Sequence, residues 1–182
     1  MASNGGSYLA AHIRGRAIFG EFIEFIARAK GEKESPALRD IDLMSDYKLA
    51  RNLYIFDVHK GEPTFWIRFV GNNICEFFGF DTTNRYLESL KFDENFDETI
   101  VGDQTIVQGK APAAFMNYIA FDEPRLTKFK KGRQFVMIRL AFPLLDDQGD
   151  VVNIVGAMDF VDVEAAPAER FVQLPLSAII ED

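Results

Sequence analysis

Apolar side chains recur at helical spacing between Tyr8 and Lys30, and this pattern predicts an amphipathic helix. The residues before it, 1–7, are small and polar, so we expect them to be disordered. Gly31 supplies a C-terminal stop. One face of the helix carries four apolar residues at spacings of four, three and four: Ile18, Phe22, Phe25 and Ala29. Because such a helix is only marginally stable alone, this face must pack against another surface.

Two β-rich segments follow, Leu53 to Val58 and Thr64 to Val70, and the turn-forming residues between them predict a hairpin. A short helix is predicted between Gly71 and Gly79, where an asparagine stands at the cap and a glycine at the stop. Further helices are predicted from Thr83 to Leu90 and from Phe96 to Gly109.

The last part of the core predicts three strands, Ala113 to Phe121, Gln134 to Leu145 and Val151 to Val161. Two strands, then short helices, then three strands make an antiparallel α+β domain, because an α/β fold needs regular alternation of strands and helices. We divide the chain into an N-terminal helical extension and linker (1–48), a core (49–162) and a C-terminal tail (163–182).

Composition narrows the class of protein. A length of 182 residues with 48% hydrophobic residues suits one domain, and the net charge of −8 disfavours a nucleic-acid surface. One cysteine excludes an internal disulfide. The sequence has no apolar run of the length that a membrane span needs and no secretory leader pattern, so we expect a cytoplasmic protein without a membrane partner.

Two local motifs resemble the PAS sensory domain. Residues Phe69 to Asp81 are similar to the family's strand end, capped short helix and glycine, and Pro143 to Gly156 to its last hairpin. With Leu38 to Asp42 and Trp66 to Gly71, the pattern is most similar to short, often stand-alone PAS proteins known mainly from alphaproteobacteria, and the resemblance covers residues 38–162. It implies a bacterial sensory or protein-interaction module that lacks catalytic activity.

The resemblance also implies an architecture. A five-stranded antiparallel sheet in the order 2-1-5-4-3 would carry short helices on one face and the N-terminal helix on the other. A sheet covered on both sides explains why both parities of its strands are apolar. Signalling would act in trans, through a partner protein or a homodimer whose seam is the face of Ile18, Phe22, Phe25 and Ala29.

By the same resemblance, the pocket would bind a small apolar or weakly acidic ligand, or none, between the sheet and the short helices. The pocket residues that the resemblance implies are Phe56, Phe77, Phe78, Tyr86, Met116, Tyr118, Met137 and Arg139. Arg139 lies between apolar strand neighbours and needs a partner. We expect an internal ion pair with Asp57 or Asp159, with an acidic ligand as the alternative.

Flavin and haem are disfavoured, because the sequence lacks the residue patterns that hold these cofactors in PAS domains. Cys75 stands in an Ile-Cys-Glu context that differs from the photoactive flavin-binding pattern, and we expect it to be structural. The histidines, His12 and His59, lie outside the helix from which haem-binding PAS domains take their axial ligand.

Two charged clusters are interpreted as solvated surface, and no metal site is predicted. The acidic cluster comprises Asp93, Glu94, Asp97, Glu98 and Asp103. The basic run comprises Lys128, Lys130, Lys131 and Arg133.

One enzyme hypothesis stays open. A small cone fold of the ketosteroid-isomerase kind uses a buried Asp as general base for isomerisation or hydration, and Asp57 and Asp159 are the candidates. The sequence contains no hydrolase elbow, Walker loop, zinc-protease motif or dinucleotide fingerprint. Strand order separates the two hypotheses, because cone folds place helices before strands.

Overall fold

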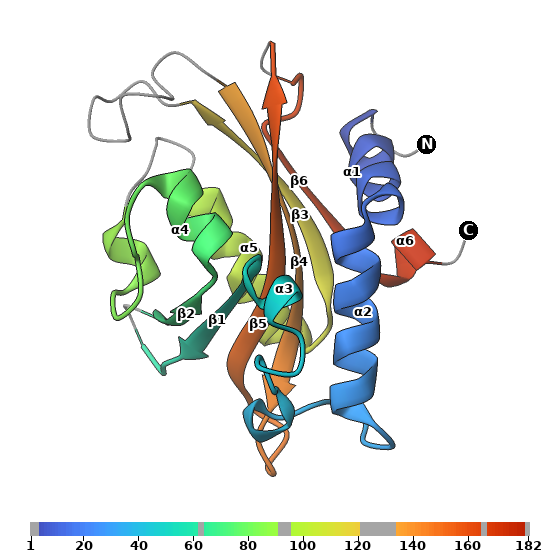
Figure 1. Ribbon diagram of the computed structural model, residues 1–182, viewed down its shortest axis with the longest axis vertical. Helices are drawn as coiled ribbons and strands as arrows, with labels where there is room; N and C mark the ends of the chain where they lie inside the picture. The colour runs from blue at the N-terminus through green and yellow to red at the C-terminus, as the bar shows by residue number, and fades with distance from the viewer. Residues whose placement is uncertain (1–3, 62–63, 91–95, 121–133, 165–166, 181–182) are drawn as a thin grey trace.

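The computed structural model describes residues 4–61, 64–90, 96–120, 134–164 and 167–180. Its centre is an antiparallel sheet in the order β2-β1-β5-β4-β3-β6 (Figure 1). The strands are β1 (Leu53–Val58), β2 (Phe65–Val70), β3 (Ala113–Ala120), β4 (Gln134–Leu145), β5 (Val151–Val163) and β6 (Phe171–Pro175). The α+β class and the PAS-like order 2-1-5-4-3 are confirmed. The sheet has one further strand, β6, which pairs with β3. It is formed by the C-terminal segment that was expected to be a tail.

Helices cover both faces of the sheet (Figure 1). They are α1 (Asn4–Gly15), α2 (Ala17–Lys30), α3 (Tyr47–Ala50), α4 (Asn72–Phe78), α5 (Phe96–Gly109) and α6 (Ser177–Ile180), with 3₁₀ turns η1 (Leu38–Asp40) and η2 (Leu87–Ser89). The pair α1 and α2 lies on one side, and α4 and α5 lie on the other. Residues from both sides therefore meet the same strands.

The N-terminal segment differs from its prediction in two ways. Residues 4–7 were expected to be disordered, yet they form the first turn of α1. The predicted single helix is two helices, because Arg16 has an extended backbone between them. The helices thus meet at a break whose position is set by this one residue.

The helix predicted from Thr83 to Leu90 is wrong except for the turn η2. Its backbone instead pairs with β2, where the Ile67 N–H donates to the Arg85 carbonyl at 2.8 Å and the Asn84 N–H donates to the Ile67 carbonyl at 2.9 Å. Trp66 and Tyr86 form an isolated bridge there. Backbone groups used in this way are not free to close helical turns.

Each face of the sheet has its own apolar core, as the apolar residues of both parities predicted. On the α2 side, the Phe22 ring packs edge-on against Phe142 with centroids 5.6 Å apart. Four α2 side chains are buried there: Phe19, Phe22, Phe25 and Ile26. Full burial of such side chains contributes about 1.5–3 kcal/mol each to the stability of the fold.

The predicted subunit seam lies partly inside the core of its own chain. Phe22 and Phe25 are buried against the sheet of their own chain, while Ile18 and Ala29 are half-buried. The most buried side chains of the apolar face of α2 therefore pack within the chain.

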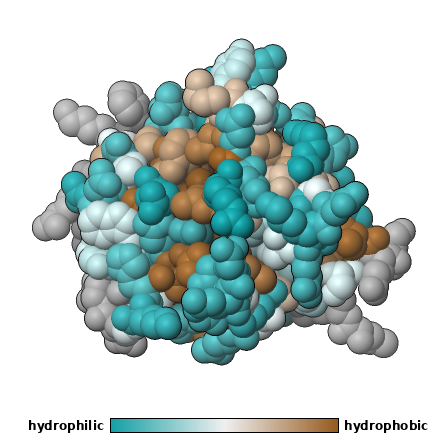
Figure 2. Space-filling model, turned by 90° about the horizontal axis from the view of Figure 1, so that it is seen from below, coloured by the Kyte–Doolittle hydropathy of each residue, from teal (hydrophilic) through white to brown (hydrophobic). Residues whose placement is uncertain are grey.

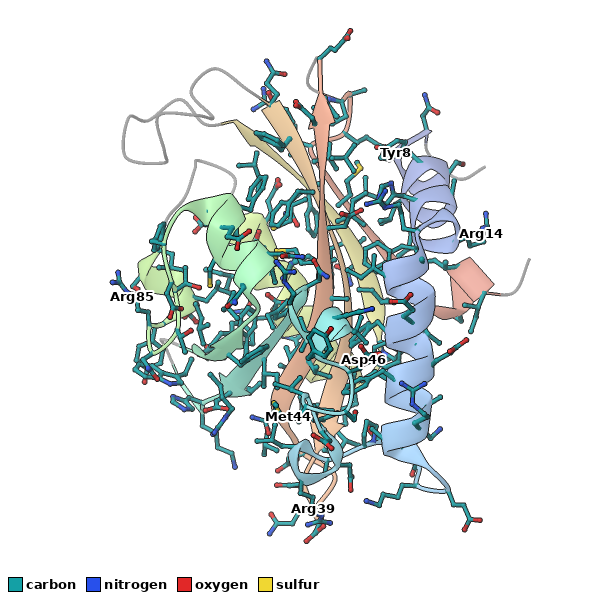
Figure 3. The ribbon with its side chains drawn as sticks, viewed as in Figure 1. Tyr8, Arg14, Arg39, Met44, Asp46 and Arg85 are labelled. Carbon is teal, nitrogen blue, oxygen red and sulfur yellow. The ribbon has the colours of Figure 1, made fainter. Side chains whose placement is uncertain are left out.

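The surface is largely hydrophilic on the side seen in Figure 2, with separate apolar patches. Figure 3 shows Tyr8 and Arg14 on α1 and Met44 and Asp46 on the connection between α2 and β1. Among the described residues, the exposed large apolar side chains are Tyr8, Met44, Tyr47, Val101, Val152 and Ile180. No helix in the described ranges is long and apolar enough to cross a membrane.

Candidate functional site

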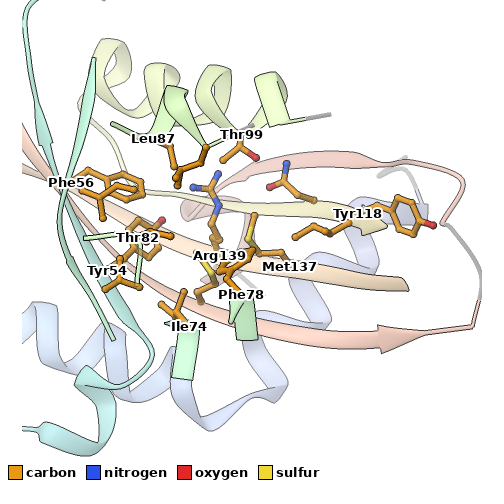
Figure 4. A pocket seen from close by; sticks show the side chains of 16 residues that line it. Tyr54, Phe56, Ile74, Phe78, Thr82, Leu87, Thr99, Tyr118, Met137 and Arg139 are labelled. Carbon is orange, nitrogen blue, oxygen red and sulfur yellow. The ribbon is translucent and has the colours of Figure 1, made fainter. Parts of the chain in front are cut away.

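A pocket lies between the sheet and the helices α4 and α5, and Figure 4 shows Arg139 near its centre. It offers about 50 Å³ to the centres of water-sized molecules, room for roughly four waters. Its lining is apolar except at a few points. The lining residues are Tyr54, Phe56, Ile67, Val70, Ile74, Phe78, Thr82, Leu87, Leu90, Thr99, Asn117, Tyr118, Ile119, Met137, Arg139 and Met158.

Strand register brings the polar lining residues together. Arg139 of β4 lies opposite Met158 of β5 and Phe115 of β3. Two residues along on the same face, Met137 lies opposite Asn117. Directly opposed residues point to the same face of a sheet, so Arg139, Met158 and Asn117 share the pocket side.

Two glycines allow close packing around the site. A Cβ at Gly156 would overlap the ring and hydroxyl of Tyr54, the residue opposite it on β1. A Cβ at Gly102 of α5 would lie 2.9 Å from the ring of Phe115. The first glycine lets the Tyr54 ring lie on β5, and the second lets α5 approach the sheet.

That approach brings Asp103 of α5 onto Arg139. The Nη1 group of Arg139 donates to both carboxylate oxygens of Asp103, at 3.1 and 3.0 Å. The two side chains are 1% and 0% exposed. On its other side, the guanidinium lies 4.9 Å from the centroid of the Phe115 ring, a cation–π contact.

Burial and charge oppose each other in this cluster. Burial raises the pKa of Asp103, and the neighbouring Arg139 works against that rise. Burial alone would lower the pKa of Arg139, but Asp103 and Tyr54 raise it, so the guanidinium stays charged. Burial also raises the pKa of Tyr54, which keeps its hydroxyl protonated.

Several buried polar atoms here have no hydrogen-bond partner among the described residues. They are Nε and Nη2 of Arg139, the hydroxyl of Tyr54 and Oδ1 of Asn117. The Tyr54 hydroxyl and the Arg139 guanidinium nevertheless lie close enough to interact with each other, so they form one polar group on the pocket wall. A buried polar group without a partner costs about 1–3 kcal/mol. All three residues line the same pocket, so a guest molecule there could satisfy donors and an acceptor at once.

Five of the eight predicted pocket residues line this pocket: Phe56, Phe78, Tyr118, Met137 and Arg139. Tyr118 lies at the outer end, with its ring pointing away from Arg139 (Figure 4). The guanidinium of Arg170 lies 5.6 Å from the centroid of that ring.

The other three lie elsewhere. Met116 faces the α2 side, because it pairs with Ile138 and its neighbours Phe115 and Asn117 take the pocket side. The Phe77 ring stacks on Phe160 with centroids 3.5 Å apart. Tyr86 packs edge-on against Trp66, and its hydroxyl lies 3.1 Å from Nδ1 of His59.

The expected partners of Arg139 are both wrong, although the expected internal ion pair is present. The carboxylate of Asp57 accepts hydrogen bonds from Nε of Arg68 at 2.6 Å and from Nδ2 of Asn153 at 2.7 Å. Neither Asp57 nor Asp159 lines the pocket. Both acids sit in ion pairs, so the cone-fold hypothesis loses its two candidate bases.

Asp159 contacts the junction between α1 and α2 through His12 and Arg16. Its Oδ2 lies 2.9 Å from Nε2 of His12 and 2.9 Å from Nε of Arg16. Burial alone would raise the pKa of Asp159, but the bonds with His12 and Arg16 outweigh it and lower that pKa.

Asp103 was expected to be solvated, and this is wrong. It lies on the buried face of α5, four residues after Thr99 and three before Ile106, both of which are buried. That spacing was the signal in the sequence, but a grouping of the acids by charge alone hides it. Asp93, Glu94 and the basic run Lys128, Lys130, Lys131 and Arg133 lie outside the described residues.

The residues weighed for flavin and haem lie outside the pocket lining. Cys75 is not in the lining and its Sγ lies 3.8 Å from the Val70 carbonyl oxygen. Neither His12 nor His59 lines the pocket, and the described residues contain no group of three or more potential metal ligands.

Comparisons with known proteins give structural neighbours only. No family model and no curated protein matches the chain. A light-oxygen-voltage domain studied with a flavin analogue is 16% identical and covers 65% of this chain and 83% of its own, with a TM-score of 0.48. VqmA bound to DPO is 12% identical over 71% of this chain and 59% of its own, with a TM-score of 0.44. The PAS domain of Bordetella pertussis BvgS is 13% identical and covers 68% of this chain and 88% of its own, with a TM-score of 0.37.

Proposed function

We propose that this chain is a PAS-like sensory module that binds a small, mainly apolar molecule in the pocket around Arg139. The observation that carries the proposal is the set of unpartnered buried atoms on Arg139, Tyr54 and Asn117 in one apolar pocket. Buried polar groups are ordinarily hydrogen-bonded. A ligand that supplies the missing partners accounts for their position.

Three successive residues of β5 support a route from this pocket to the rest of the chain. Met158 lines the pocket, and Asp159 holds the junction of α1 and α2. Phe160 stacks on Phe77 of α4. A ligand that moves β5 would shift both helix layers, because the three side chains alternate between the faces of the sheet.

The output of the module is part of the same proposal. It signals in the cytoplasm through a partner protein or a homodimer, without nucleic acid or membrane, as in the stand-alone alphaproteobacterial PAS proteins that its motifs resemble. Since the apolar face of α2 is used in its own chain, a homodimer would form on another surface or by exchange of α2.

The proposal includes no catalytic step. The cone-fold reaction considered above would need an available carboxylate in the pocket as its general base. Asp103 is engaged by Arg139, while Asp57 and Asp159 lie outside the pocket.

Native and denaturing mass spectrometry of the purified full chain, with an absorption spectrum of the same sample, tests this function. A small molecule released on denaturation from a colourless protein is the expected result. A yellow or red species would replace the proposal with flavin or haem chemistry. A protein that is empty and also fails to bind the probes below would contradict it.

A further inference from the structure

The charge balance of the pocket bears on the kind of ligand it accepts. Asp103 engages Nη1 of Arg139 with both oxygens, so the one buried cation among the described lining residues is already paired. Glu88 adds a further negative influence near Asp103. An incoming carboxylate would therefore lose its hydration without gaining a free positive charge, which is unfavourable in a buried site.

The buried polar atoms of Arg139, Tyr54 and Asn117 still need hydrogen-bond partners. Nε and Nη2 of Arg139 are donors, and the Tyr54 hydroxyl, which interacts with that guanidinium, is itself a donor and an acceptor. Oδ1 of Asn117 is an acceptor. A carbonyl oxygen would suit the donors, and an N–H or O–H group on the same molecule would suit Asn117.

The remaining lining residues set the size and polarity of the ligand that the pocket can take. Around these groups lie apolar side chains, including Phe56, Ile74, Phe78 and Leu87 (Figure 4). Room for roughly four waters corresponds to a molecule about the size of one small ring. The pocket therefore suits a small ring or branched chain with one compact polar end.

From these observations we infer that the pocket selects a neutral molecule with a carbonyl-type acceptor and an adjacent donor, and rejects carboxylates of the same shape. This inference rests on the proposed function of the pocket. It narrows the expected ligand, which was apolar or weakly acidic, to an uncharged one.

Benzamide and benzoate form a matched pair of probes, because they have the same shape and differ in charge and in the donor. Titration calorimetry on the full chain at neutral pH should give a benzamide Kd at least about tenfold below that of benzoate. Tyr54→Phe should weaken benzamide binding about fivefold through loss of one hydrogen bond. Tyr86→Phe, a matched change outside the pocket, should leave the Kd unchanged.

A second variant tests the role of charge directly. Asp103→Asn removes the carboxylate that neutralises Arg139, so it should reduce or reverse the preference for benzamide over benzoate. If this variant does not fold, the wild-type preference and the Tyr54→Phe effect still decide the question.

The outcomes separate the two proposals. Equal or tighter binding of benzoate by the wild-type chain overturns the inference and leaves the pocket as a binding site. Failure of both probes to bind overturns the inference. If the protein also releases no small molecule on denaturation, the proposed function is overturned with it.

Discussion

Arg139 and Asp103 form an ion pair that is shut off from solvent, with Nη1 3.1 and 3.0 Å from the two carboxylate oxygens. One residue comes from the central strand β4 and the other from α5, so the pair joins the sheet to the helix that closes the pocket. Because Asp103 takes only Nη1, the proposed function leaves Nε and Nη2 of the same arginine for the pocket.

Replacing one member of this pair should destabilise the protein strongly. Arg139→Met leaves Asp103 as an uncompensated buried carboxylate, and the expected loss is about 3–5 kcal/mol in the free energy of unfolding. Urea denaturation followed by circular dichroism measures it.

The control is Arg39→Met, which breaks the exposed pair with Asp147. It should leave the urea midpoint almost unchanged, because an exposed ion pair contributes little to stability. The double variant Arg139→Met/Asp103→Leu should recover most of the stability lost by Arg139→Met, because no unpaired charge remains. A single variant as stable as the wild type would contradict the buried pair.

Gly156→Ala should displace the Tyr54 ring, since a Cβ there would overlap both the ring and the hydroxyl. We expect a loss of about 1–3 kcal/mol in unfolding free energy. Gly20→Ala is the matched control in the exposed part of α2, where a Cβ meets nothing within 4 Å. It should stabilise the protein by about 0.5–1 kcal/mol. Equal effects of the two changes would show that Tyr54 does not lie over β5.

Asp159 predicts an acid-dependent loss of stability. Its folded-state pKa is lowered, so its contribution is complete above the unfolded value of about 3.9 and is lost as the pH falls through the lower folded value. The difference in unfolding free energy between the wild type and Asp159→Asn should be largest above about pH 5 and shrink toward pH 3. Thermal denaturation at a series of pH values measures it.

The exposed change Glu21→Gln on α2 serves as the control for the pH series. A difference between wild type and Asp159→Asn that grows on acidification would have the wrong sign and would refute the ion-pair account of the α1–α2 junction.

Phe22→Ala should cost about 3–5 kcal/mol in unfolding free energy, because the Phe22 ring is buried against Phe142 of its own chain. The mass in solution, measured by light scattering, should be the same as that of the wild type. Conversion of a wild-type dimer to a monomer by this change would restore the subunit seam predicted from the sequence.

The strands and the longer helices were predictable because their periodicity is strong. The segment 53–58 and the helix 96–109 have the bounds expected from the sequence. The strand β6 was missed because Phe171 to Pro175 is short and ends in a proline, which is disfavoured inside a sheet. This segment is a strand because it pairs with β3, and such a long-range pairing cannot be predicted from the local sequence.

The candidate site was predictable only in part because faces and register depend on distant pairing. Arg139 was correctly seen to need a partner, but the partner comes from a helix 36 positions earlier in the chain. Met116 was assigned to the wrong face. Neighbouring residues of a strand point to opposite faces, and in β3 the pocket face belongs to Asn117. Tyr54 was overlooked although it shares a face with Phe56, two residues further along β1.

The central claim is that the pocket around Arg139 binds a small neutral molecule, and the methionine methyl groups test it most directly. Met137 and Met158 line the pocket, Met116 faces α2, and Met44 is 83% exposed. Methyl NMR spectra of the full chain, recorded during a benzamide titration, should show saturable shifts at Met137 and Met158 while Met116 and Met44 stay in place. Unchanged Met137 and Met158 signals at saturating benzamide, or shifts of all four together, would contradict the claim.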